Sequence, residues 1–235
     1  MFKLEFRVII VSSMPIDWYP LWLSLKVATL ATALAWLPGL WVGCRLAHRR
    51  FRGQAVLDAA VGLPLALPPT VLCYYLLVLF GRDSPLGRFS EWITGSPLVF
   101  SWQAAVVAAM FQTLPLLAIS ARAALESVEG SYQRAARSLG ASEWRVFWRV
   151  SLPLARRSIL AATVLACARS LGDFGITIMI AGYIPGRTET LAAAIYDAAH
   201  GGNGALARAL VIVISAAAIA LLFLPSRRVS PQATG

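Results

Sequence analysis

Histidine, cysteine and acidic residues are scarce in this sequence. Its 235 residues include two histidines and three cysteines, and 11 Asp and Glu stand against 21 Lys and Arg. The histidines are far apart, and the cysteines show neither the CxxC spacing nor the neighbouring histidine that zinc sites use. Each cysteine lies inside an apolar stretch, as small core residues do: Cys44, Cys73 and Cys167. No metal site is therefore expected.

Motifs of catalysis and of nucleotide binding are also missing. The sequence has no GxxxxGK[ST] phosphate loop, so any ATP that drives this protein must be bound by another chain. It has no HExxH motif, no GxSxG motif and no paired carboxylates that would suit an intramembrane enzyme. We expect neither catalytic residues nor a bound cofactor.

Apolar residues, by contrast, are abundant. They make up 58% of the chain and the mean hydropathy is +0.69, whereas a soluble domain is roughly half apolar. The chain therefore belongs in a lipid bilayer. Its net charge of +10 could indicate a nucleic-acid partner, but the arginines cluster in loops beside apolar stretches. Retention of positive loops on the cytoplasmic side explains this clustering, so no nucleic acid is expected.

Five apolar stretches have the length needed to cross about 30 Å of hydrocarbon as a helix. We therefore expect an all-α integral membrane protein with one transmembrane domain, residues 21–224. Its spans would lie at about 21–44, 55–80, 98–121, 158–181 and 205–224.

The arginines of the connecting segments predict the orientation of these spans. Thirteen lie in the three segments expected inside, and four are counted with the two loops expected outside, namely Arg82, Arg88, Arg187 and Arg208. Positively charged loops stay in the cytoplasm, so we expect the N-terminus outside and the C-terminus inside. Residues 1–20 would form a periplasmic segment without a removable signal peptide, and 225–235 a cytoplasmic tail.

Proline and polar residues interrupt the expected spans. Pro64, Pro68 and Pro69 would break the second span and release carbonyls that neighbouring helices or water must satisfy. A pathway-lining helix and a merely kinked structural helix are equal alternatives there. Polar groups at membrane depth usually face the bundle interior. The candidates for lining a pathway are therefore the polar residues of three spans: Thr70, Gln112, Thr113, Arg169, Asp173 and Thr177.

Arg169 and Asp173 stand four residues apart in the expected fourth span. That spacing places both on one helical face, where they can neutralise each other. A structural ion pair is favoured over a role in binding substrate, because the aspartate would repel a doubly charged anion.

An arginine-rich segment, about 130–153, separates the third and fourth spans. Ser131 can cap a first short helix in it, and Gly140 can take the left-handed conformation that ends this helix. The close-packing face of the helix would consist of small and apolar residues: Ala135, Ala136 and Leu139.

A second short helix should follow this corner. Ser142 can cap it, and its apolar side would be one aromatic stripe of Trp144, Phe147 and Trp148, with Pro153 after its end. Such a helix would lie along a surface. From spacing alone, an ordinary amphipathic loop helix is an equal alternative.

This segment resembles the "EAA" coupling loop of ATP-binding cassette (ABC) importer permeases, which docks into a groove on the ATPase subunit. Arg134 stands where the family usually has a glutamate, whereas the Ala-Ala, Gly and Leu-Pro framework is present. The resemblance implies that the residues contacting the ATPase are Arg134, Ala135, Ala136, Gly140, Glu143, Leu152 and Pro153.

A broader resemblance covers roughly residues 20–225. Residues 63–89, 98–125 and 168–198 are similar to the molybdate permease subunit of bacterial ABC importers. The stretch Ile184–Thr188, with Leu191 and Ala194–Asp197, is typical of the oxyanion branch of these permeases, which also carries tungstate and sulfate or thiosulfate.

The resemblance implies a type I ABC importer permease fold and a multi-pass location in the bacterial inner membrane. It also implies a second copy of this chain, two cytoplasmic ATPase subunits and a periplasmic oxyanion-binding protein as partners, with transport by alternating access. The alternatives are a tungstate or sulfate permease, the permease of a polar-solute importer, and a channel or membrane scaffold without a motor.

Overall fold

The computed structural model describes residues 17–47, 52–128 and 130–226, and every regular element in them is helical. The predicted all-α fold is therefore confirmed. Most of the predicted N-terminal segment and C-terminal tail, and residues 48–51 of the first inner loop, lie outside the described residues. In chain order the elements are α1 (Tyr19–Ala47), α2 (Gln54–Ala66), α3 (Pro69–Phe80), α4 (Pro85–Thr94), α5 (Trp102–Glu126), α6 (Gly130–Ser138), α7 (Glu143–Val146), the π-helical turn η1 (Phe147–Ser151), α8 (Leu152–Leu171), α9 (Gly175–Ala181), α10 (Leu191–His200) and α11 (Gly204–Ser226).

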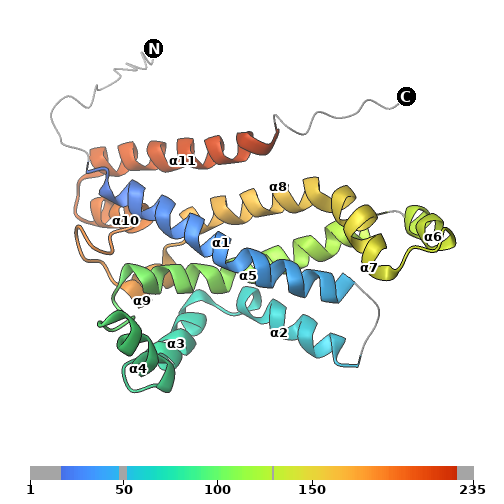
Figure 1. Ribbon diagram of the computed structural model, residues 1–235. Helices are drawn as coiled ribbons and strands as arrows, with labels where there is room; N and C mark the ends of the chain where they lie inside the picture. The colour runs from blue at the N-terminus through green and yellow to red at the C-terminus, as the bar shows by residue number, and fades with distance from the viewer. Residues whose placement is uncertain (1–16, 48–51, 129, 227–235) are drawn as a thin grey trace, which may run out of the picture.

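Within the described residues, four helical segments are long and apolar enough to cross a membrane, and a bent pair can supply a fifth span. The long segments are Tyr19–Ala47, Trp102–Glu126, Glu143–Leu171 and Gly204–Phe223; the bent pair is α2 with α3. In Figure 1 the short helices α6 and α7 lie at one end of the bundle, and α4, α9 and α10 lie at the opposite end. The long helices thus connect two ends of the bundle, each of which carries short helices.

The predicted second span is two helices rather than one, because α2 and α3 meet at an angle of 109°. Pro68 and Pro69 follow Leu67, whose backbone is extended. Proline lacks an amide hydrogen and disfavours the helical conformation in the residue before it. The proline pair therefore ends α2 and starts α3, where Pro69 fits the first turn.

The predicted fourth span, 158–181, is wrong at both ends. Its helix α8 begins at Leu152 directly after the π-helical turn η1, with Pro153 in its first turn. Pro153 thus lies within a helical segment that continues from Glu143 to Leu171, instead of following the end of a surface helix. The helix stops at Leu171, and after a turn at Gly172 the chain starts the separate helix α9.

The predicted outer loops contain short helices that the turn-rich sequence did not indicate. Ser84 caps α4, since its Oγ accepts a hydrogen bond of 2.8 Å from the Gly87 amide, and Pro85 occupies the first turn. The second outer loop contains α10.

Small residues allow α1 and α5 to lie side by side at the centre of the bundle (Figure 1). A Cβ atom added to Gly43 would stand 2.6 Å from the Ala118 carbonyl oxygen, and one added to Gly39 would stand 2.9 Å from the Leu117 Cβ. Close helix approach through small residues is typical of membrane bundles. This packing fixes α5, which presents polar residues to α8.

Candidate functional site

The coupling segment is built as a corner between α6 and α7. Gly140 has a φ of +80°, the left-handed conformation predicted for it. Arg137 and Glu143 close the corner with two hydrogen bonds, of 2.8 Å from Nε and 3.1 Å from a terminal nitrogen. The hydrogen bonds to Glu143 raise the pKa of the Arg137 guanidinium. The corner therefore holds the two short helices at a fixed angle.

The outer surface of this corner is apolar and exposed. Leu139 is 88% exposed and Trp144 is 72% exposed, and Ala135 also faces outward. Two residues of the predicted close-packing face, Ala135 and Leu139, are therefore exposed in this chain. Exposed large apolar side chains grouped on one surface mark a site of contact with another protein or with the membrane. Arg134 is likewise exposed beside Ala135, and Ala136 is half-buried.

The capping predictions for the two short helices have mixed outcomes. Helix α6 begins at Gly130, so Ser131 lies inside it and is not its cap. Ser142 does occupy the N-cap position of α7, but its side chain makes no capping hydrogen bond.

The aromatic stripe of α7 divides between two roles. Trp144 and Trp148 are exposed and contact each other edge to face, with 5.4 Å between ring centroids. Phe147 instead packs against the cluster of apolar side chains that includes Leu125. The stripe thus offers two tryptophans to a partner and anchors the helix through the third ring.

A π-helical turn joins α7 directly to α8. The Leu152 amide bonds to the Phe147 carbonyl, five residues earlier, and the helix continues without a break to Leu171. Leu152 and Pro153 therefore lie at the start of a membrane helix that is continuous with the coupling surface. Such turns are often found at functional sites.

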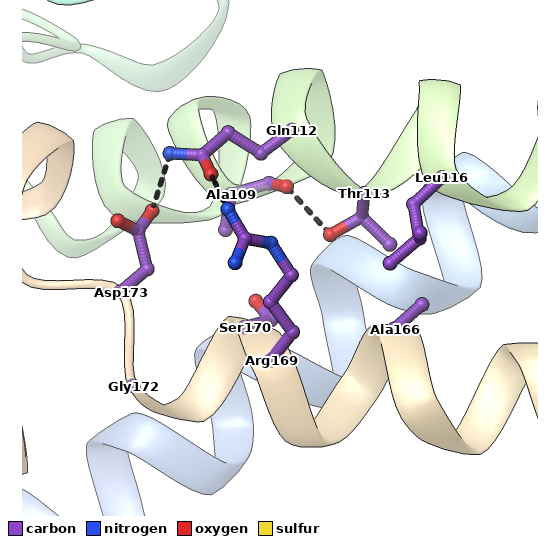
Figure 2. Close-up of a pocket in the computed structure, with 9 residues that line it drawn as sticks. All are labelled: Ala109, Gln112, Thr113, Leu116, Ala166, Arg169, Ser170, Gly172 and Asp173. Carbon is purple, nitrogen blue, oxygen red and sulfur yellow. Dashed lines mark hydrogen bonds between the residues drawn. The ribbon is translucent and has the colours of Figure 1, made fainter. Parts of the chain in front are cut away.

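A small polar pocket lies between α5 and α8 (Figure 2). Its volume is about 100 Å³. Four of the six predicted pathway residues line it: Gln112, Thr113, Arg169 and Asp173. The structure thus brings together side chains that are about 60 residues apart in the sequence.

Gln112 bridges the two charged residues of this pocket. Its Nε2 donates to Asp173 Oδ2 at 3.2 Å, and its Oε1 accepts from Arg169 at 3.4 Å (Figure 2). The predicted direct pairing on one helical face is wrong, because α8 ends at Leu171, before Asp173. Within the described residues, no direct ion pair joins Arg169 to Asp173.

Ser170 adds a polar group to the pocket that sequence reasoning missed. Its Oγ is buried and has no hydrogen-bond partner among the described residues. Buried polar groups of this kind are usually satisfied by water, and the pocket has room for about three molecules. Nothing in the sequence beyond its place beside Arg169 marks Ser170.

The other two pathway candidates lie elsewhere. Thr177 is only 3% exposed and sits on α9 within the packed interior, whereas Thr70 is exposed near the start of α3. Neither lines the pocket between α5 and α8.

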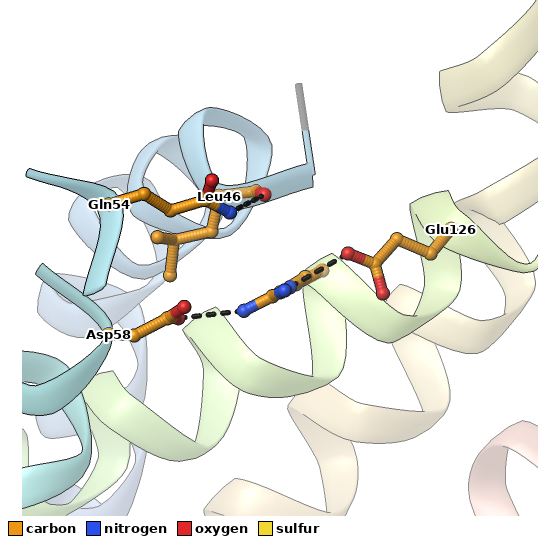
Figure 3. Close-up of polar contacts among 5 residues, drawn as sticks. Leu46, Gln54, Asp58 and Glu126 are labelled. Atoms are coloured by element: carbon orange, nitrogen blue, oxygen red, sulfur yellow. Dashed lines mark hydrogen bonds and ion pairs between the residues drawn. The ribbon is translucent and has the colours of Figure 1, made fainter. Parts of the chain in front are cut away.

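At the C-terminal end of α5, a polar cluster that the sequence did not reveal ties three helices together (Figure 3). Arg122 contacts Asp58 of α2 at 2.7 Å and Glu126 of its own helix at 2.8 Å. Gln54 donates to the Leu46 carbonyl at the end of α1 at 3.2 Å. These contacts fix the broken helix pair against the bundle close to the coupling segment.

Comparison with known proteins finds a family and relatives that match most of this chain. Residues 39–229 match the family model described as "Binding-protein-dependent transport system inner membrane component". The molybdenum transport system permease protein ModB of Escherichia coli K12 is 43% identical over 209 residues, which are 88% of this chain and 91% of that protein. ModB of Mycobacterium tuberculosis is 40% identical over 200 residues, 85% of this chain and 75% of that protein.

Solved structures share the fold at lower identity. An inward-facing methionine ABC transporter, MetNI, matches with a TM-score of 0.73 and 20% identity, over 92% of this chain and 96% of that one. A bacterial alginate ABC transporter, solved in complex with a periplasmic protein, matches with a TM-score of 0.71 and 15% identity, over 94% and 82%. The type I ABC importer permease fold is thereby confirmed.

Proposed function

Because the chain belongs to the family of binding-protein-dependent transport system inner membrane components, we propose that it is the permease subunit of an ATP-driven importer that carries molybdate across the bacterial inner membrane. The observation that carries this proposal is the likeness, at 40% identity or above over most of the chain, to permeases of molybdenum transport systems. The exposed coupling corner agrees with it, since a channel without a motor has no use for such a surface.

The partners follow from the permease role. A transporter subunit of this class works with an ATPase and with a periplasmic binding protein. For this chain we propose two copies of the permease, with an ATPase seated on each coupling corner. The residues of that contact would be those predicted from the coupling pattern, with Trp144 and Leu139 added, because they are the most exposed apolar side chains of the corner.

The geometry suggests how ATP could drive the pathway. When the ATPases close on ATP, they would draw the two coupling corners together. The Arg137–Glu143 clamp keeps α6 and α7 at a fixed angle, and α7 continues through η1 into α8. Movement of the corner would thus be transmitted along α8 to Arg169 at the polar pocket. Alternating access in this chain would thus depend on α8 acting as a lever between the coupling corner and the polar pocket.

The polar pocket would pass an anion without holding it tightly. The charge of Arg169 is offset by Asp173 through Gln112, so no group of cations replaces the hydration shell of a doubly charged anion. A transporter must release its ion as readily as it takes the ion up. A neutral hydrogen-bonding site meets this need.

Reconstitution tests the substrate. The permease, its ATPase and its binding protein in proteoliposomes should take up labelled molybdate when ATP is supplied, and a tenfold excess of sulfate should reduce this uptake only slightly. Sulfate is the competitor of choice because a chloroplastic sulfate permease of Chlamydomonas reinhardtii is 33% identical over 207 residues. Strong competition by sulfate, or no molybdate uptake, would contradict the proposed substrate.

The orientation of the spans yields a second prediction. In a variant without the native cysteines, Asp83→Cys and Ile184→Cys should react with an impermeant thiol reagent added to sealed cells, whereas Ser138→Cys should not. All three positions are exposed, whereas a cysteine at Thr188, which is 3% exposed, would be hidden. Ser138→Cys should react once the cells are permeabilised. Labelling of position 138 in sealed cells would reverse the proposed topology.

A further inference from the structure

A second, larger cavity lies where three connecting segments meet at the end of the bundle opposite the coupling corner. It has a volume of about 800 Å³ and is formed by the end of α3, the segment before α5 and the α9–α10 loop. Its lining includes Arg82 and Arg187 and no acidic residue. The cavity therefore has a positive charge that is not balanced within its own walls.

Neither arginine is neutralised by the fold. Among the described residues, the guanidinium groups of Arg82 and Arg187 have no ion-pair or side-chain hydrogen-bond partner. Apart from residues 1–20, four arginines lie on the side predicted to be outside, and two of them line this one cavity. Two unpaired cations in one cavity, on the side where cations are few, indicate a negatively charged ligand.

The loop that carries Arg187 is held in place from both sides. Tyr19 Oη donates to the Arg187 carbonyl at 2.9 Å, and the Arg187 amide donates to the Ile184 carbonyl at 3.0 Å. Thr188 anchors the loop further, since its Oγ1 accepts from the Ile184 amide and donates to the Gly182 carbonyl. The backbone is thus fixed, while the guanidinium has no partner in the part of the chain that the structure describes.

The acidic residue nearest to Arg187 in the sequence is engaged elsewhere. Glu189 accepts hydrogen bonds from Tyr183 Oη at 3.1 Å and from the Gly186 amide at 3.4 Å. Burial raises the pKa of the Tyr183 phenol, and the nearby carboxylates of Glu189 and Asp197 raise it further, so Tyr183 remains a donor at neutral pH. Glu189 is therefore kept from cancelling the charge of Arg187.

The wall formed by the segment before α5 is also specifically shaped. Phe100 has a φ of +62°, which is unfavourable for a residue with a side chain. Its amide donates to the Ile180 carbonyl at the end of α9 at 2.9 Å, and a Cβ added to Gly182 would stand 3.2 Å from its ring. Backbone strain of this kind persists where the surrounding structure requires it, often at ligand sites.

We infer that this cavity is an outer vestibule that receives a hydrated tetrahedral oxyanion, with Arg82 and Arg187 as its binding residues. The inference rests on the proposed function, because it assigns this anion its first contact with the permease. The volume corresponds to roughly 25 water molecules at about 30 Å³ each, so the anion would keep most of its hydration shell. The two arginines would then raise the local concentration of the anion without holding the anion in one orientation.

Proteoliposomes that contain the permease, its ATPase and its binding protein test the vestibule. The double variant Arg82→Gln/Arg187→Gln should take up labelled molybdate about tenfold more slowly than wild type at low salt, and this difference should shrink as ionic strength rises. Its ATPase activity stimulated by the binding protein should stay within about twofold of wild type. The matched control is Arg88→Gln/Arg208→Gln, which removes the same outer charge away from the cavity and should lose less than twofold.

Each other outcome has a distinct meaning. Wild-type uptake by the double variant, or an equal loss in the control, would overturn the vestibule. Parallel loss of uptake and of stimulated ATPase activity would show that the arginines dock the binding protein instead, which also overturns it. If the wild-type assembly imports no molybdate, the proposed function fails. The vestibule would then be tested with the oxyanion that the assembly does import.

Discussion

Replacing Gly140 with valine should reduce ATP-driven uptake to below about a tenth of wild type, while the amount of permease in the membrane stays unchanged. The φ of +80° at this corner costs a β-branched residue roughly 1–2 kcal/mol or more. A side chain at Gly140 would meet no atom within 4 Å, so the backbone conformation is the only property disturbed. Relaxation of this strain would change the angle between α6 and α7. Trp144 would then move away from the surface of the ATPase that we propose it contacts.

Asparagine provides the matched control, because it adopts the left-handed conformation more readily than other side chains. The variant Gly140→Asn should retain most of the uptake although it adds a polar side chain at the same place. Co-purification of the ATPase, measured for both variants, separates lost docking from lost transmission of movement. Normal uptake by Gly140→Val would show that the corner is not needed for coupling.

Replacing Asp173 with alanine should lower the amount of folded permease in the membrane about tenfold, more than replacing Asp173 and Arg169 together. An unpaired arginine at the centre of a bilayer costs about 2.5–3.5 kcal/mol on insertion scales, reduced here by the remaining bond to Gln112. In the double variant, neither charge is left without the opposite one. Water can fill the polar pocket that remains. Asp173→Asn, which keeps an acceptor for Gln112, should fall between wild type and Asp173→Ala.

Detergent-extracted permease, quantified by size-exclusion chromatography from equal amounts of membrane, gives the comparison. Equal losses in the single and double variants would show that the charges do not balance each other through Gln112. Gln112→Leu adds a further check, because it removes the bridge while keeping both charges. If this variant accumulates normally, Arg169 and Asp173 do not need the amide between them.

The spans could be predicted from the sequence because burial in lipid demands long apolar runs, although two of the five runs are each divided between two helices, α2 with α3 and α8 with α9. The proline pair at 68–69 also predicted a break, since proline acts through local geometry. The end of α8 before Asp173 could not be predicted in this way, because helical periodicity continues through Leu171 with no proline to stop it.

The pocket and the vestibule could not be predicted from the sequence, for a different reason. Gln112 is 57 residues from Arg169 and 61 from Asp173, and the vestibule draws on three segments that meet only in the folded chain. Spacing within one helix therefore suggested the nearest partner for Arg169, whereas the fold supplied a bridging amide from another helix. The coupling corner was predictable because its residues are contiguous.

The π-helical turn at Phe147–Ser151 has a consequence for changes in chain length. Its hydrogen bond spans five residues instead of four, so the turn accommodates one residue more than a regular helix would. Deleting one residue there should restore an ordinary α-helix and leave Trp144 and Arg169 in nearly the same rotational phase. The same deletion further along α8 would turn one relative to the other by about 100°. The π-helical turn is therefore the place in this helix where evolution can add or remove one residue. Such a change leaves the proposed ATPase contact and the membrane pocket in nearly the same rotational relation about the helix axis.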